Sequence, residues 1–85
     1  MKHELKTWPV YFQATWAGAK FFEIRKNDRD FKINDEIVLK EFIPENGADG
    51  EYTGREIEGF IRYVTGDLCK EGYVTFSFDE THRQE

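Results

Sequence analysis

A carboxylate and a guanidinium stand two positions apart at Glu23 and Arg25, and these residue types are suited to recognising polar ligands. Apolar and charged residues alternate from 21 to 25, which predicts a strand with Glu23 and Arg25 on one face and Phe22 and Ile24 on the other. A guanidinium fork matches a phosphate or a base edge, and a carboxylate matches an exocyclic amine such as cytosine N4. The alternative is a salt bridge at the surface worth about 0–1 kcal/mol, and the spacing alone favours it.

The two readings of this pair predict different behaviour. If Glu23 and Arg25 bind a ligand, both are at least partly accessible, and Arg25→Ala weakens binding while the melting temperature barely changes. If they form a buried structural pair, the same substitution leaves a buried carboxylate unpaired and costs about 3–5 kcal/mol of stability.

Other side chains are candidates for the same cleft. Lys20 joins the pair only if the strand begins after it, because strict alternation places it on the face of Phe22. Trp8 precedes Pro9 at the start of a predicted helix, where a partly exposed ring could stack on a base. The predicted site comprises a core of Lys20, Glu23 and Arg25, with Lys6, Trp8 and Lys26 at its edge.

The turn after this strand carries further positive charge. Lys26, Arg29 and Lys32 could extend a rim that positions phosphates. For Arg29 and Lys32 a solvated turn, paired with Asp28 and Asp30, is the favoured interpretation.

The net charge of −5 argues against general nucleic-acid binding. However, residues 1–32 hold seven basic and four acidic side chains, whereas the rest of the chain holds five basic and thirteen acidic ones. An acidic body with one basic segment can direct an anionic ligand to one face. We therefore expect the basic residues of the first third to gather around one concavity.

No metal or other cofactor is expected. Cys69 is the single cysteine, so neither an internal disulfide nor a cysteine-based zinc site can form, and His3 and His82 lie near opposite ends of the chain. The N-terminal segment lacks the apolar region of a signal peptide, and no run approaches the ~20 apolar residues of a membrane span. These features predict a soluble, cytoplasmic protein.

The helix and strands expected to position these residues make up a mixed α+β, mainly β fold. With 85 residues there is room for one domain, assigned to residues 1–79, and a polar tail at 80–85. A helix is expected over Pro9–Ala17, ended by Gly18 and packed through Phe12 and Trp16. Strands are expected near 3–6, 21–25, 37–43, 55–65 and 73–78, with a hairpin loop at 46–50. Such short strands bury their faces best in a partly closed barrel of five or six strands.

The pattern Gly-x-Lys-x-x-Glu-x-Arg at Gly18–Arg25, between a helix and a strand, resembles the signature of the activating signal cointegrator homology (ASCH) domain in the PUA-like superfamily. The chain is also similar to a small ASCH-related family of phage and Gram-positive bacterial proteins. That similarity covers nearly the whole chain, including the motifs at 3–9, 22–31, 52–56 and 72–74. The resemblance implies a barrel of PUA type that binds RNA in a cleft beside the signature.

Some ASCH relatives are amidohydrolases that act on an acetylated cytidine, and the resemblance places Lys20 and Glu23 at two of their site positions. The nucleophile there is a threonine, whereas this chain has Glu23, and a carboxylate does not replace a hydroxyl in amide hydrolysis. The leading hypothesis is thus a non-catalytic module that binds RNA or a nucleotide-like ligand. The alternatives are a small hydrolase of a modified nucleoside or RNA, and an adaptor that binds a protein partner through its acidic face.

Overall fold

Five strands and one helix make up the fold in a computed structural model, which describes residues 1–45 and 49–85. In chain order the elements are β1 (Lys2–Thr7), α1 (Pro9–Trp16), β2 (Phe22–Lys26), β3 (Glu36–Pro44), β4 (Gly50–Thr65) and β5 (Tyr73–Gln84). The predicted mainly β fold with an N-terminal helix is confirmed. The hairpin loop expected at 46–50 falls mostly on residues 46–48, which lie outside the described part of the chain.

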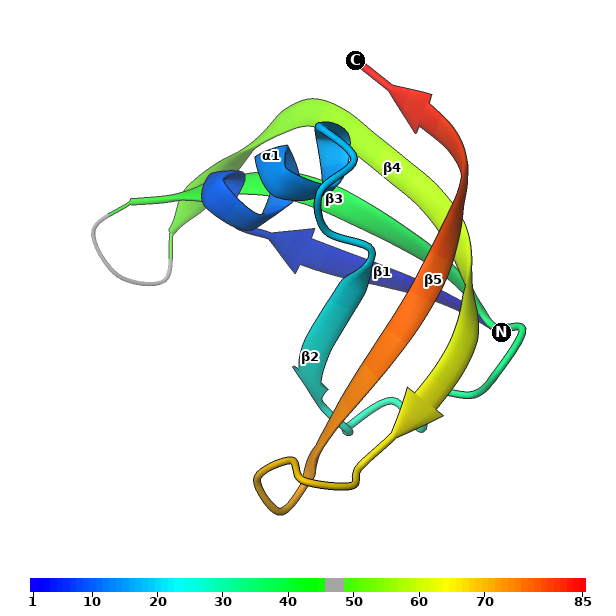
Figure 1. The fold of residues 1–85 in the computed structure, drawn as a ribbon. Coiled ribbons are helices and arrows are strands. Elements are labelled where there is room, and N and C mark those ends of the chain that lie inside the picture. Colours follow the sequence, from blue (N-terminus) through cyan, green and yellow to red (C-terminus); the bar gives the residue numbers. More distant parts are fainter. Residues whose placement is uncertain (46–48) are drawn as a thin grey trace.

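The strands form one sheet in the order β1-β3-β4-β5-β2. β1 runs parallel to β3, and the other neighbours are antiparallel. The sheet curls into a partly closed barrel, so that its two edge strands, β1 and β2, approach each other without pairing (Figure 1). We call this opening between β1 and β2 the seam.

The inner face of the curled sheet forms the hydrophobic core. Val74, Phe76 and Phe78 point inward from β5, as the alternation predicts. The pairing of β4 with β5 shifts register between Ile61 and Tyr63, which turns the Tyr63 ring outward. The buried hydrophobic cluster consists of Leu5, Phe12, Phe31, Ile37, Leu39, Ile57, Ile61, Val74, Phe76 and Phe78.

Helix α1 covers the end of the barrel at which β1 ends (Figure 1). Pro9 occupies its first turn, and Gly18 follows its C-terminus with a φ of +83°, a conformation that glycine adopts readily. The ring of Phe12 is fully buried and stacks on Trp16 at 5.8 Å. The predicted packing of the helix through these two aromatic residues is confirmed. No helix among the described residues is long and apolar enough to cross a membrane.

An ion pair between the half-buried Arg55 and the buried Glu41 fastens the helix to the sheet. The Arg55 guanidinium donates to both carboxylate oxygens of Glu41, at 2.9 and 3.0 Å, and the Thr53 hydroxyl donates to the same carboxylate at 2.7 Å. The guanidinium carbon lies 5.0 Å from the ring centre of Phe12 and 4.8 Å from that of Trp16. Arg55 therefore links β3 and β4 to the aromatic side chains of α1. Thr53 and Arg55 give the motif at 52–56 a structural role.

The Glu41 carboxylate should make the protein sensitive to acid. Its hydrogen bonds with Arg55 hold its pKa below the ordinary value, with help from Thr53 and against the effect of burial. A carboxyl group whose pKa is lower in the folded state stabilises the fold above its unfolded pKa, near 4.5, and loses that contribution as the pH falls through the folded pKa.

We therefore expect Glu41→Gln to be less stable than the wild type at pH 7 by about 1–3 kcal/mol. The difference should shrink as the pH falls from 5 to 3, because the wild-type carboxylate becomes protonated. Melting temperatures from circular dichroism at each pH measure this. A difference that stays constant over that range would contradict the role of the Glu41 charge.

The C-terminal segment differs from the prediction of a polar tail after residue 79. β5 continues to Gln84 and pairs with β4 up to Glu56. The hydrogen bonds between neighbouring strands form between backbone groups. A strand of polar residues therefore continues at the exposed end of the sheet, although it has no apolar face to bury. The segment also contacts the helix, because Arg83 donates to the Trp16 carbonyl at 3.1 Å and its guanidinium stacks over the Trp16 ring.

Candidate functional site

The seam is held together by arginine side chains instead of a strand ladder. Arg25 of β2 donates to the Lys6 carbonyl at 3.0 Å, and Arg29 of the following turn donates to the Glu4 carbonyl at 2.7 Å. Arg29 pairs with Asp28 at 3.8 Å in an exposed turn, as expected, but its guanidinium also reaches across to β1, which the sequence did not predict. Lys32 does pair with Asp30 at the exposed turn, as expected.

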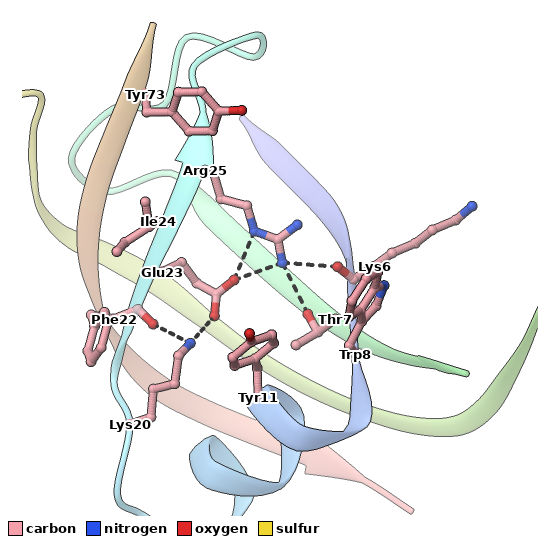
Figure 2. Close-up of a pocket in the computed structure, with 10 residues that line it drawn as sticks. All are labelled: Lys6, Thr7, Trp8, Tyr11, Lys20, Phe22, Glu23, Ile24, Arg25 and Tyr73. Carbon is pink, nitrogen blue, oxygen red and sulfur yellow. Dashed lines mark hydrogen bonds and ion pairs between the residues drawn. The ribbon is translucent and has the colours of Figure 1, made fainter. Parts of the chain in front are cut away.

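A cleft with a volume of about 1020 Å³ opens along the seam beside α1 (Figure 2). Three of its lining side chains are basic and one, Glu23, is acidic. The aromatic rings of Trp8 and Tyr11, which are 56% and 53% exposed, stand at the junction of β1 and α1. The described residues that line it are Lys6, Thr7, Trp8, Tyr11, Lys20, Phe22, Glu23, Ile24, Arg25 and Tyr73.

The floor of the cleft is an ion cluster centred on Glu23. One carboxylate oxygen accepts from Arg25 Nε at 2.9 Å and lies 2.7 Å from Arg25 Nη2, and the other accepts from Lys20 Nζ at 2.5 Å. Lys20 reaches this cluster because β2 begins at Phe22, which frees residue 20 from the alternation of the strand. The three predicted core residues of the site therefore come together (Figure 2), with a net charge of +1.

The expectation that Glu23 is accessible is wrong. The residue is only 4% exposed, and both carboxylate oxygens already accept hydrogen bonds from neighbouring cations. A buried carboxylate engaged in this way is poorly placed to accept from an exocyclic amine, so Glu23 holds Lys20 and Arg25 in position. Arg25 itself remains partly accessible, since its side chain is 25% exposed.

The alternation in β2 is confirmed, but the charged face is the inner one. Phe22 and Ile24 are 44% and 62% exposed, whereas Glu23 points into the seam. The guanidinium of Arg25 also lies 3.3 Å from the Thr7 hydroxyl, which is buried. The inner face of β2 thus carries charged side chains, and their hydrogen bonds and ion pairs in the seam compensate for the loss of water.

Lys6 and Trp8 line the cleft as predicted, whereas Lys26 does not. Lys26 lines a smaller adjoining cavity of about 160 Å³ together with Arg25, Arg29 and Asp28. Its side chain lies on the outer face of β2, opposite Tyr73 of β5 in the register.

Five lining residues were not predicted from the sequence: Thr7, Tyr11, Phe22, Ile24 and Tyr73. The alternation in β2 placed Phe22 and Ile24 on the face away from Glu23, so no local pattern assigned them to the cleft. Tyr11 follows Trp8 by three residues, which is the spacing of neighbours on a helix surface, and this signal could have identified it. Thr7 and Tyr73 reach the cleft only through tertiary contacts, for which the sequence carries no local signal.

His3 belongs to a structural cluster at the far end of β1. It is buried, its Nε2 lies 2.8 Å from a carboxylate oxygen of Asp35, and its ring packs against Phe31. Burial raises the pKa of the Asp35 carboxyl, but hydrogen bonds with His3, the Lys32 amide and the N-terminal ammonium outweigh burial and hold it below its ordinary value. Within residues 1–45 and 49–85, no three histidine, cysteine or carboxylate side chains gather as a metal site.

Comparison with known proteins identifies relatives along almost the full chain. A phage protein, the "Uncharacterized 12.9 kDa protein in GpA 3'region" of Escherichia phage P2, is 38% identical over 74 residues. The match covers 85% of this chain and 62% of the phage protein. Residues 2–78 match the family model described as "Domain of unknown function (DUF3850)". The matched residues include the ion cluster and both strands of the seam. The chain therefore belongs to the DUF3850 family.

Proposed function

We propose that this protein is a non-catalytic module of ASCH type, within the PUA-like superfamily, that binds single-stranded RNA or a nucleotide in the cytoplasm. The observation that carries the proposal is the composition of the cleft at the seam. In a protein with a net charge of −5, Lys20 and Arg25 meet there around a single acidic side chain, and Lys6 lines the edge of the cleft with its ammonium 4.6 Å from the Phe42 ring centre. Such an arrangement directs an anionic ligand to this face.

The side chains of the cleft match the two parts of a nucleotide. Lys6, Lys20 and Arg25 supply positive charge for phosphate, and a guanidinium or ammonium forms strong hydrogen bonds with phosphate oxygens. The exposed rings of Trp8 and Tyr11 supply surfaces on which a base can stack, an interaction worth about 1–3 kcal/mol per base. A volume of about 1020 Å³ is at the upper end of the range for single small ligands, which favours one or two nucleotides over a duplex.

The hydrolase alternative is less well supported by this geometry. Glu23 occupies the position of the nucleophile in the hydrolytic ASCH relatives, and here its carboxylate is buried between two cations. The Thr7 hydroxyl donates to the Leu5 carbonyl and contacts Arg25, so its proton is directed away from a substrate. Both hydroxyl and carboxylate therefore serve to hold the cations of the cleft.

The proposal predicts a shallow salt dependence of binding. A labelled single-stranded RNA hexanucleotide, followed by fluorescence anisotropy, should give a slope of log K against log salt of about −1 to −3, because one to four phosphates contact the cleft. Lys6→Ala should weaken binding about 3- to 10-fold and make the slope shallower by about 0.7, because it removes one phosphate contact.

Lys32→Ala is the matched control, since Lys32 is an exposed lysine that pairs with Asp30 outside the cleft. It should leave both affinity and slope unchanged. Equal effects of the two substitutions, a steep slope, or equal affinity for duplex DNA would contradict binding in the cleft. Saturable binding of a protein partner with no RNA binding would favour the adaptor alternative.

A further inference from the structure

β2 exposes one of its backbone edges to the seam, and the hydrogen bonds of the ladder show which residues do so. Phe78 N–H donates to the Phe21 carbonyl, and Asn27 N–H donates to the Gly72 carbonyl. Residues directly opposite each other in an antiparallel pair alternate between bonded and non-bonded pairs. Odd-numbered residues of β2 therefore bond to β5, and the N–H and C=O groups of the even-numbered residues face the seam.

Two of these three even-numbered residues already have a partner for the carbonyl. Lys20 Nζ donates to the Phe22 carbonyl at 2.6 Å, and Asp28 N–H donates to the Lys26 carbonyl at 2.9 Å. Ile24 is the residue of β2 for which neither the N–H nor the C=O has a partner among the described residues. It lies between Glu23 and Arg25 of the ion cluster and lines the cleft.

On the opposite edge of the seam, arginine side chains already engage two backbone carbonyls. The Lys6 and Glu4 carbonyls of β1 accept from Arg25 and Arg29. Ile24 therefore presents an adjacent donor and acceptor in the cleft, close to a partly exposed guanidinium and to the aromatic rings of the α1 side.

We propose that the backbone N–H and C=O of Ile24 recognise the edge of one unpaired nucleobase. This inference rests on the proposed function and specifies how that site selects its ligand. Each nucleobase presents a donor and an acceptor side by side on its Watson–Crick edge, and a residue at a free strand edge presents the complementary pair. In a duplex that edge is occupied by the partner base, so the site selects single strands and rejects double helices.

Proline at position 24 tests this directly. Proline lacks the N–H, and it is tolerated in an edge strand where the missing N–H faces away from the ladder. Ile24→Ala is the matched control, because it shortens the same side chain and keeps the N–H. Ile24→Pro should bind a mixed-sequence single-stranded RNA hexanucleotide about 10-fold more weakly than Ile24→Ala. Equal affinity of two folded variants would overturn the inference.

A second measurement on the wild-type protein decides the question even if the proline variant does not fold. Hydrogen exchange of the Ile24 amide, followed by NMR, should be fast in the free protein and at least 10-fold slower with the hexanucleotide bound. RNA binding that leaves the Ile24 amide unprotected would overturn this inference and leave the proposed function in place.

Two further outcomes are distinguishable. Absence of any RNA or nucleotide binding would overturn the proposed function, and this inference with it. Protection of the Ile24 amide by an extended peptide, with no protection by RNA, would assign the free edge to strand addition by a protein partner and would overturn recognition of a base.

Discussion

Replacing Arg25 with alanine is expected to lower the free energy of unfolding by about 2–4 kcal/mol, because the substitution leaves the buried Glu23 carboxylate with one cation instead of two. It also removes the hydrogen bonds to the Lys6 carbonyl and the Thr7 hydroxyl, which fasten β2 to β1. For a domain of this size each kcal/mol corresponds to about 4–8 °C in melting temperature. The melting temperature should therefore fall by at least about 8 °C.

Arg25→Lys separates charge from geometry in this experiment. It keeps a cation beside Glu23 but loses the fork that contacts Glu23, Lys6 and Thr7 together, so it should lie between the wild type and Arg25→Ala. A melting temperature unchanged in Arg25→Ala would show that the pair is dispensable for the fold. That result would restore the reading of Arg25 as a residue that serves the ligand alone.

Arg55→Ala should cost a comparable 2–4 kcal/mol, about the size expected when one partner of a mostly buried pair is removed. The substitution leaves Glu41, whose side chain is 7% exposed, with Thr53 as its remaining hydrogen-bond donor. It also removes a guanidinium from the faces of Phe12 and Trp16. Chemical denaturation measures the loss, and the fluorescence of Trp16 should report loosening of α1.

Arg62→Ala is the control for this second substitution, because Arg62 and Asp79 form an exposed pair worth about 0–1 kcal/mol. If the two arginine variants lost equal stability, the fastening role of the Arg55–Glu41 pair would be contradicted. Because α1 carries Tyr11, loss of this anchor should also disturb one wall of the cleft.

Much of the fold follows from local patterns. Pro9 and Gly18 mark the ends of the helix, and the alternating residues of β5 identify its inner face. The parallel pairing of β1 with β3 has no local signal, because it joins segments more than thirty residues apart. The extension of β5 to Gln84 was missed for a related reason: backbone pairing stabilises it, whereas its side chains are polar.

The sequence identified most of the charged residues of the candidate site, but it did not predict their arrangement in space. The spacing of Glu23 and Arg25 placed them on one strand face, and the structure confirms this. Which face is buried depends on partners supplied by β1, and Arg25 meets the Lys6 carbonyl from nineteen positions along the chain. The same is true of Arg29, whose contact with the Glu4 carbonyl no pattern within its own turn predicts.

Chemical-shift mapping shows directly whether the cleft at the seam binds a single-stranded RNA or a nucleotide. The wild-type protein, labelled with ¹⁵N, is titrated with the four nucleoside monophosphates and then with the RNA hexanucleotide. Saturable shifts are expected in Lys6–Tyr11 and Lys20–Lys26, with Arg62 and Asp79 on the outer surface unchanged. No saturable shift with any of these ligands, or shifts confined to residues outside the seam, would contradict binding of RNA or a nucleotide in the cleft.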